Sequence, residues 1–341
     1  MKEALMTGAG VIDFREVEVP TVGDHDVLIR VRRIGVCGSD IHVYHGKHKY
    51  MTFPVVQGHE GAGTVEKIGA SVIGLKVGDR VTIMPVLYCG KCRPCRNGKV
   101  NVCENVKFIG VSAMGMASDY FLADASKVVL LPDDMEFEQG AMVEPVAVAL
   151  HAIHRAGGVR DANVLVMGAG PIGNLVAQAA KTMGAKGVMI TDLNPHRLKI
   201  AEECGIDYPV NVGSEELNDA VERAFGTDGP DVIFDCAAVK ATLNQATSIA
   251  RKGTNIVIVG NFTEPVTIEM GLMQRREISF ISVMIYLPED FTTAIELLSA
   301  GKIHTEQLIT NHFKFADYLE AYRFIDQHSN EVMKVMIDVA D

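Results

Sequence analysis

The chain has 341 residues, which corresponds to roughly two domains of average size and suffices to bury a core without disulfide bonds. It carries 32 lysine and arginine residues against 43 aspartate and glutamate residues, and the resulting net charge of −11 argues against a nucleic-acid-binding protein. A hydrophobic fraction of 48% is too high for a disordered chain, and the sequence contains no recognisable membrane span or signal peptide. We therefore expect a cytoplasmic protein that binds no membrane.

The first part of the chain predicts an irregular, mostly β domain. Short runs rich in β-branched residues are separated by glycine and proline, as expected for small strands joined by turns. The strand candidates are Val27–Val31, Gly63–Ile68 and Asp79–Ile83.

Seven cysteines, an odd number, argue against a disulfide framework and favour metal or thiol chemistry. Four of them have the spacing Cys89-x2-Cys92-x2-Cys95-x7-Cys103, which suits a closed, structural, tetrahedral zinc site. The lysines and arginines interleaved with them would offset the charge of four thiolates. An iron–sulfur cluster and four reduced thiols without a metal are the alternatives, but no second cysteine cluster supports the former.

From about Ala141 onward the pattern becomes helical, and then apolar strands alternate with amphipathic helices. Near-continuous apolar runs of this kind are typical of strands buried on both faces of a parallel sheet. This half therefore predicts a doubly wound α/β domain. Its strand candidates are Val164–Met167, Val188–Thr191, Val232–Phe234, Ile256–Val259 and Ile278–Val283.

The end of the chain departs from this alternation after Pro288. The sequence predicts two helices, Glu289–Ala300 and about Ala316–His328, and a final strand, Lys334–Val339. Because the parallel sheet is complete before this tail, we expect the tail to pack on the first domain. The predicted boundaries are 1–148 and 289–341 for the first domain and 149–288 for the second.

A dinucleotide site is predicted where the first α/β strand ends. It is followed at once by Gly168-x-Gly170-x-x-Gly173, in which the glycines would allow a tight turn, a close approach to pyrophosphate, and packing of helix on strand. Pro171 and Ile172 begin the helix whose N-terminus would face the phosphates. An ordinary glycine turn is the alternative, but the order of strand, turn, helix and second strand favours the nucleotide.

The nucleotide is expected to be NAD. Asp192 ends the second strand, nineteen residues beyond Gly173, where a carboxylate can accept hydrogen bonds from the ribose 2′-hydroxyl and would repel a 2′-phosphate. Arg197 lies close enough in sequence to leave NADP as the less favoured alternative. Val259 and Gly260, where a later strand ends, are further cofactor-binding candidates.

A second metal site is predicted from residues spread through the first domain. Cys37, His59, Glu60 and Glu144 could supply one thiolate, one imidazole and one or two carboxylates, a mixed set that leaves room for water or substrate at a zinc ion. Each of these residues taken alone would more often be an ordinary core or surface residue, so the prediction depends on their combination.

These motifs together resemble a known family. The stretch Gly58-His59-Glu60-x-x-Gly63-x5-Gly69-x-x-Val72 is similar to the zinc alcohol dehydrogenase signature. With Cys37-Gly38-Ser39-Asp40, the four cysteines and the glycine loop, the whole chain resembles the zinc-dependent medium-chain dehydrogenases, in the sorbitol, threonine and butanediol branch. The resemblance implies a GroES-like catalytic domain, a Rossmann NAD domain, one catalytic and one structural zinc, and a homo-oligomer, either tetramer or dimer.

The resemblance also implies roles for individual residues. Cys37 and His59 would be catalytic zinc ligands, Glu60 a ligand or close neighbour, and Glu144 a ligand or the holder of a metal-bound water. Asp40 would orient His59, and Ser39 and His42 stand where the family has its proton relay, although a solvated loop residue is an equal alternative for His42.

The implied reaction transfers hydride between a secondary alcohol and NAD and gives the ketone. A non-catalytic, NAD-sensing regulatory protein on the same fold is the alternative. The segment Val283–Pro288 lacks the arginine of sorbitol-type enzymes, Val43 replaces an aromatic residue, and Met114–Ala117 replaces a double glycine. These departures indicate a less polar pocket than that for sorbitol.

Overall fold

The computed structural model describes residues 1–48 and 53–340, and the chain divides into two compact units. Unit 1 comprises Met1–Glu144, Leu287–Ser299 and Ile309–Asp341, and unit 2 comprises Pro145–Tyr286 and Ala300–Leu308. The division falls inside helix α3, Phe137–Arg155. In the described residues, no helix has both the length and the apolar character that crossing a membrane requires.

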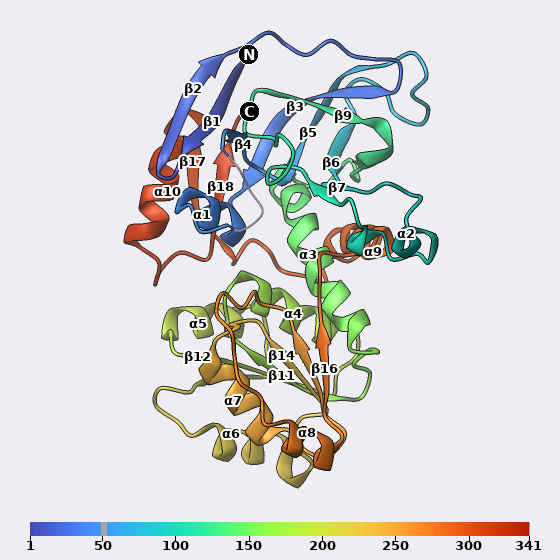
Figure 1. Ribbon diagram of the computed structural model, residues 1–341. Coiled ribbons are helices and arrows are strands. Elements are labelled where there is room, and N and C mark those ends of the chain that lie inside the picture. The colour runs from blue at the N-terminus through green and yellow to red at the C-terminus, as the bar shows by residue number, and fades with distance from the viewer. Residues whose placement is uncertain (49–52, 341) are drawn as a thin grey trace. The chain divides into compact units, whose positions relative to one another are not determined.

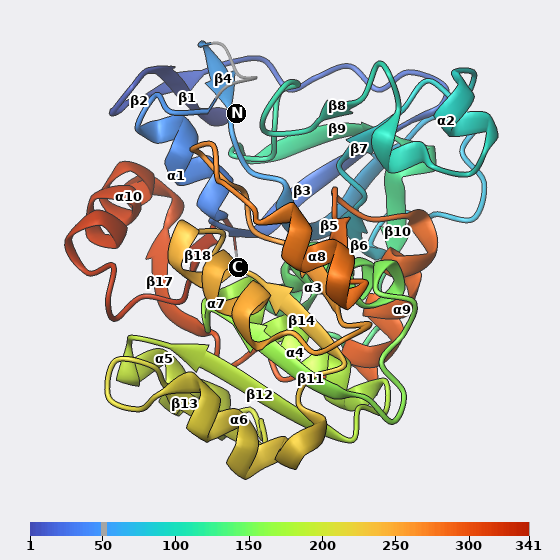
Figure 2. The same cartoon turned by 60° about the horizontal axis from the view of Figure 1, so that its bottom comes forward.

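Unit 1 is built around β3, Asp26–Gly35, whose Val27, Ile29 and Val31 are fully buried. The main sheet has the order β10-β6-β5-β3-β18-β17, with β9 also paired to β3. Strands β3, β5 and β6 lie side by side in Figure 2. The strands of this main sheet are β3, β5 (Glu60–Ile68), β6 (Arg80–Ile83), β9 (Tyr120–Asp124), β10 (Val128–Leu130), β17 (Ile309–Lys314) and β18 (Lys334–Asp338).

Smaller elements complete unit 1. Strands β2 (Val11–Glu16), β1 (Lys2–Gly8) and β4 (Val55–Val56) form a second sheet, and β7 (Val86–Leu87) pairs with β8 (Lys107–Phe108) around the cysteine-rich segment. The helices are α1 (Gly38–Tyr44), α2 (Arg93–Arg96), α9 (Pro288–Ser299) and α10 (Tyr318–Gln327), with short 3-10 turns at Val100–Val102, Ala125–Lys127 and Phe315–Asp317. The predicted packing of the tail on the first domain is seen in the antiparallel pairing of β18 with β3.

Unit 2 contains a parallel sheet of order β13-β12-β11-β14-β15-β16. This is the doubly wound strand order of dinucleotide-binding domains, so the predicted fold class is confirmed. All five residues of β11, Asn163–Met167, are buried, as a strand covered on both faces requires. The other strands are β12 (Gly187–Asp192), β13 (Tyr208–Asn211), β14 (Val232–Asp235), β15 (Asn255–Ile258) and β16 (Ser279–Ser282).

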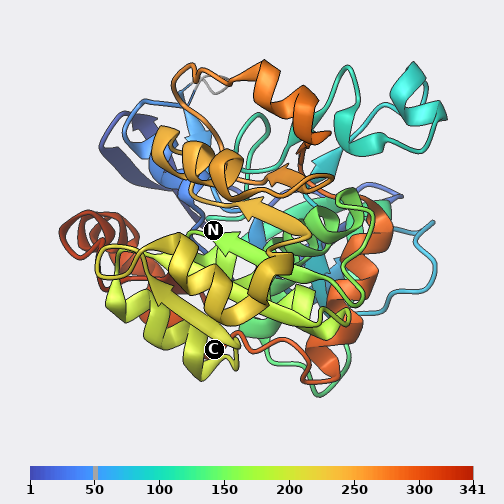
Figure 3. The same cartoon turned by 90° about the horizontal axis from the view of Figure 1, so that it is seen from below.

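Helices cover both faces of this sheet. In Figure 1, α4 and α5 lie above it and α6 and α7 below it, and in Figure 3 the latter two are in front of the sheet. The helices of unit 2 are α4 (Pro171–Thr182), α5 (Pro195–Glu203), α6 (Leu217–Phe225), α7 (Lys240–Ile249) and α8 (Met270–Arg276), and a 3-10 turn spans Gly226–Asp228.

One segment of the C-terminal tail belongs to a different unit from the one that the predicted domain boundaries give it. Ala300–Leu308 belongs to unit 2, although the sequence assigned all of 289–341 to the first domain. Its backbone is tied to α4, because the side chain of Gln178 both donates to the carbonyl of His304 (3.0 Å) and accepts from its N–H (2.7 Å). The buried Gln178 on α4 thus binds a loop to unit 2, although the sequence predicts that this loop belongs to the first domain.

Candidate functional site

Helix α1 places two of the predicted site residues. Cys37 is the residue before its first turn, and the backbone N–H of Cys37 donates to Oδ2 of Asp40 at 2.9 Å. An aspartate in this position satisfies an otherwise unpaired N–H group at the helix start. Asp40 is only 1% exposed, so this hydrogen bond to the Cys37 backbone is shielded from water.

Cys37, His59 and Glu60 come together as one cluster. One ligand atom from each lies within 4.8 Å of those of the other two. His59 and Glu60 are buried where β5 begins, and Nδ1 of His59 lies 3.5 Å from Oδ1 of Asp40 without a hydrogen-bond partner. A thiolate, an imidazole and a carboxylate converging in this way form a donor set that fits a catalytic zinc ion.

The charge of this cluster favours a cation. Burial of the His59 ring opposes its protonation, but the neighbouring charges of Asp40 and Cys37 outweigh burial and raise the pKa of His59 well above its usual value. Asp40 stands where an oriented metal-ligating histidine needs its carboxylate partner.

Glu60 has a partner that sequence reasoning missed. The buried Nζ of Lys334, on β18, donates to both carboxylate oxygens of Glu60 at 2.6 and 2.7 Å, and to the carbonyl of Val36 at 3.2 Å. Burial lowers the pKa of Lys334, but the nearby charges of Glu60, Cys37 and Glu144 outweigh this effect and raise it. Gly35 leaves space for the pair, because a Cβ there would lie 2.2 Å from Oε2 of Glu60.

The other predicted catalytic residues, Glu144, Ser39 and His42, lie outside the cluster of Cys37, His59 and Glu60. Glu144 is buried in α3 and acts electrostatically on Lys334, but among the described residues it is not part of the group within 4.8 Å. Ser39 is half-buried in the first turn of α1, and His42 is exposed on the same helix.

The four cysteines of the predicted structural site also converge. The Sγ atom of Cys92 lies 3.3 Å from that of Cys95 and 3.7 Å from that of Cys103, and the latter lies 3.5 Å from Sγ of Cys89. Four sulfurs around zinc at about 2.3 Å would be about 3.8 Å apart, so the set fits a tetrahedral ion. Backbone N–H groups of Lys91 and Cys92 lower the pKa of Cys89 to about 6, which favours the thiolate.

The glycine loop lies between β11 and α4. Gly168 has φ +97°, a conformation that other residues rarely adopt, and a Cβ on Gly173 would lie 1.8 Å from the carbonyl oxygen of Gly168. A Cβ on Gly170 would meet nothing within 4 Å. The first and third glycines are therefore required by the fold itself, whereas the second leaves open space at the start of α4.

Asp192 has a structural contact in addition to its predicted role. Its Oδ2 accepts from the backbone N–H of Ala169 at 2.8 Å, and its Oδ1 accepts from that of Asn194 at 2.9 Å. The carboxylate therefore links the end of β12 to the glycine loop.

The remaining cofactor-binding candidates are distributed around the same end of the sheet. Pro171 and Ile172 begin α4, Arg197 is half-buried in α5, and Val259 and Gly260 follow β15. The N–H groups of Val259 and Gly260 both donate to the carbonyl of Asp235, at 3.0 Å each. Their positions follow the carboxyl ends of parallel strands, where nucleotides bind in doubly wound folds.

Comparison with known proteins adds the family. The family described as "Alcohol dehydrogenase GroES-like domain" matches residues 23–133, and that described as "Zinc-binding dehydrogenase" matches residues 171–300. The D-arabitol-phosphate dehydrogenase of Enterococcus avium is 36% identical, over 95% of this chain and 93% of its own. The sorbitol dehydrogenase of Bacillus subtilis (strain 168) is 31% identical, over 99% of this chain and 97% of its own.

A solved structure agrees with these relatives. An alcohol dehydrogenase from E. coli CFT073, in complex with NADH, superimposes with a TM-score of 0.93 and 31% identity, covering 99% of both chains. The chain belongs to the zinc-dependent medium-chain alcohol dehydrogenases. The sorbitol dehydrogenase-like branch predicted from the sequence is confirmed by the curated relatives.

The glycine loop of this dehydrogenase allows a paired test. We expect Gly173→Ala to lower the free energy of unfolding by at least about 2 kcal/mol, because the new methyl group would overlap the Gly168 carbonyl. Gly170→Ala should unfold within about 0.5 kcal/mol of wild type but bind NAD about tenfold more weakly or worse, since its methyl group would occupy the approach to the pyrophosphate.

Urea unfolding and calorimetric titration with NAD measure the two effects. Wild-type NAD affinity in the Gly170 variant would contradict the assignment of this loop to the nucleotide.

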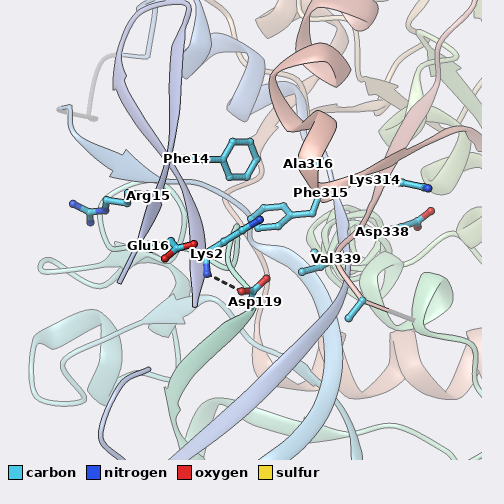
Figure 4. Close-up of a pocket in the computed structure, with 11 residues that line it drawn as sticks. Lys2, Phe14, Arg15, Glu16, Asp119, Lys314, Phe315, Ala316, Asp338 and Val339 are labelled. Atoms are coloured by element: carbon cyan, nitrogen blue, oxygen red, sulfur yellow. Dashed lines mark hydrogen bonds between the residues drawn. The ribbon is translucent and has the colours of Figure 1, made fainter. Parts of the chain in front are cut away.

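A separate cavity of unit 1 contains none of the predicted site residues. It has a volume of about 770 Å³ and lies over β1, β2 and the C-terminal segment, with Phe14 and Phe315 near its middle and Lys2, Asp119 and Lys314 around them (Figure 4). The backbone N–H of Lys2 donates to Asp119 across it at 2.7 Å. The cavity is therefore distinct from the cluster of Cys37, His59 and Glu60.

Proposed function

We propose that this dehydrogenase transfers hydride between a secondary alcohol and NAD and gives the ketone, with a polyol, sugar acid, vicinal diol or hydroxy amino acid as substrate. The observation that carries the proposal is the cluster of half-buried Cys37 with buried His59 and Glu60, and with Asp40 beside His59. The curated relatives, which are named as sorbitol and arabitol-phosphate dehydrogenases, support a substrate with several hydroxyl groups.

In this proposal the chain's residues hold the metal and position the substrate's hydroxyl group. Cys37 and His59 would bind zinc, Asp40 would fix the ring of His59, and Glu60 and Glu144 would supply a further ligand or hold a water. When bound, zinc would supply a Lewis acid for the alcohol oxygen, and NAD would accept the hydride.

A route for the proton starts on α1. The Ser39 hydroxyl is half-buried in the first turn and can accept a proton from the substrate as it passes its own onward. The imidazole of His42, exposed one turn later on the same helix, can transfer the proton to solvent. We propose this pair as the relay.

The other cofactor assignments follow the same residues. The sulfurs of Cys89, Cys92, Cys95 and Cys103 would hold a structural zinc that folds a segment with no core of its own. NAD would bind over Gly168–Gly173, with the adenosine ribose at Asp192, where the carboxylate favours NAD over NADP.

The regulatory alternative has no support in the site or among the relatives. A sensor that only bound NAD would need no cluster of thiolate, imidazole and carboxylate, and the curated relatives are named as enzymes. We further propose a cytoplasmic homo-oligomer, a tetramer or dimer. The strand β16, at the end of the sheet in unit 2, supports this assembly because edge strands offer unpaired backbone groups.

Absorbance of reduced nicotinamide tests the function. We expect wild type to reduce NAD with at least one member of a panel of polyols, sugar acids, diols and threonine. Cys37→Ala should lower kcat/KM on the best substrate by about a thousandfold or more, because loss of one of few ligands removes several kcal/mol of charge stabilisation. Metal analysis should find two zinc ions per chain in wild type and one in the variant.

A matched control uses a thiol outside the site. Cys204, a buried residue at the end of α5 in unit 2, can be replaced by alanine with retention of both zinc ions and of activity. If the Cys37 variant were as active as wild type on the best substrate, the metal mechanism would be wrong.

A further inference from the structure

A buried chain of hydrogen bonds leads from helix α10 to the catalytic cluster. The Tyr322 hydroxyl donates to Oε1 of Gln57 at 2.8 Å. Nε2 of Gln57 donates to the backbone carbonyl of Asp40 at 3.1 Å and is 3.4 Å from its Oδ1. The same Oδ1 lies 3.5 Å from Nδ1 of His59. Three side chains therefore separate a surface helix from a candidate zinc ligand.

The directions of these hydrogen bonds are fixed. Burial raises the pKa of Tyr322 well above its usual value, so its hydroxyl keeps a proton to donate. Oη of Tyr318 is 3.2 Å from Oη of Tyr322 and must donate to it, because the Tyr322 proton is engaged by Gln57. The Gln57 amide is thus oriented with its oxygen toward Tyr322 and its nitrogen toward Asp40.

Asp40 is held from two sides as a result. The N–H of Cys37 binds its Oδ2, and the Gln57 amide binds its backbone carbonyl and approaches its Oδ1. A carboxylate fixed in this way has little freedom to rotate, so the oxygen facing His59 keeps its place.

The polar side chains of Gln57 and Tyr322 are buried, although burial of polar groups is generally unfavourable. Gln57 is 1% exposed, and Tyr322 is fully buried within the apolar core of unit 1. A pair of buried polar groups can often be replaced by apolar groups of the same shape at almost no cost in stability. Packing alone would therefore accept apolar residues at positions 57 and 322 together, whereas orienting Asp40 requires an amide at position 57.

We propose that Gln57, fixed by Tyr322, is a positioning residue that orients Asp40 and through it the zinc ligand His59. The proposal rests on the proposed function, because it assigns His59 to a catalytic metal. It concerns a contact outside the ligand set and predicts that metal affinity depends on residues that do not touch the metal.

Three variants test the proposal. Gln57→Leu removes both the donor to Asp40 and the acceptor of Tyr322, Tyr322→Phe removes only the hydroxyl that orients Gln57, and Tyr318→Phe removes a buried hydroxyl that contacts Tyr322 but not Gln57. Chelator competition gives the affinity of the more weakly held zinc, and the visible spectrum of the Co²⁺-substituted enzyme reports the geometry of its ligands. Thermal unfolding verifies that each variant is folded.

We expect Gln57→Leu to weaken the catalytic-site metal about tenfold or more and to change the Co²⁺ spectrum, as loss of an outer partner of a ligating histidine usually does. Tyr322→Phe should shift affinity and spectrum in the same direction by a smaller factor, and Tyr318→Phe should stay within about twofold of wild type. The zinc held by the four cysteines should be unaffected in all three.

Wild-type affinity and spectrum in a folded Gln57→Leu or Tyr322→Phe enzyme would overturn the proposal, and so would an equal effect of Tyr318→Phe. If wild type binds the metal but oxidises no alcohol, the proposed function fails while a weakened metal in the Gln57 variant still supports the positioning role. If wild type binds only the zinc of the four cysteines, both fail.

Discussion

Replacement of Lys334 by methionine is expected to lower the free energy of unfolding by about 3–5 kcal/mol. The lysine is the cation bound to both oxygens of Glu60, and both side chains are almost fully buried, at 4% and 1% exposure. Methionine would leave the carboxylate in the interior without a partner, which costs far more than the loss of an exposed ion pair. Urea unfolding of the metal-free protein measures the difference without the contribution of bound zinc.

Two further variants show whether the loss of stability comes from the buried ion pair. The double variant Glu60→Gln with Lys334→Met should regain a large part of the lost stability, because it removes both buried charges together. Lys314→Met, on the neighbouring strand β17, replaces an exposed lysine and should change stability by no more than about 0.5 kcal/mol. A Lys334 variant as stable as the Lys314 control would show that the buried ion pair is absent in solution.

Replacement of Cys103 by serine is expected to release the structural zinc and unfold the segment around it. Sγ of Cys103 lies near those of Cys89 and Cys92 and also accepts from the N–H of Asn105 at 3.3 Å, so its loss opens the site. Zinc binding by thiolate sites contributes about 10–16 kcal/mol in small zinc-dependent peptides, and a four-residue helix such as α2 has no comparable support.

Metal analysis and limited proteolysis measure this effect. Zinc should fall from two ions per chain to one, and trypsin should cut after the exposed Lys91, Arg96 and Lys99 faster by on the order of tenfold. Cys204→Ser, which changes a buried thiol in unit 2, is the control and should keep both ions. Full zinc content in the Cys103 variant would contradict the proposed structural site.

Much of the fold could be predicted because its signals are local. Near-continuous apolar runs marked five of the parallel strands, and the glycine spacing marked the loop after β11. Strand β13 was missed, since Tyr208–Asn211 contains a proline and polar ends. It lies at the sheet's edge beside β12, where the missing N–H of Pro209 is tolerated.

The residues of the candidate site likewise divide into those that the local sequence predicts and those that only the fold brings to the site. Cysteine spacing predicted the group around Cys89, and the combination of a cysteine, a histidine and carboxylates predicted the group around Cys37, because ligand chemistry limits which residue types are useful. Lys334 and Gln57 could not be found in this way. A lysine at the first position of an apolar strand is typically an exposed flank, and a glutamine before a glycine is typical of a turn. Only the folded chain shows that Lys334 contacts Glu60 and that Gln57 contacts Asp40.

The two contacts of Asp192 bear on attempts to alter cofactor preference. Replacing this residue by alanine or glycine to admit a 2′-phosphate would also remove the acceptors of the Ala169 and Asn194 N–H groups. The turn proposed to bind the pyrophosphate would then lose this support, so we expect affinity for both nucleotides to fall together. Engineering toward NADP in this enzyme therefore has to begin by giving the Ala169 amide a new acceptor, and only then remodel the ribose pocket.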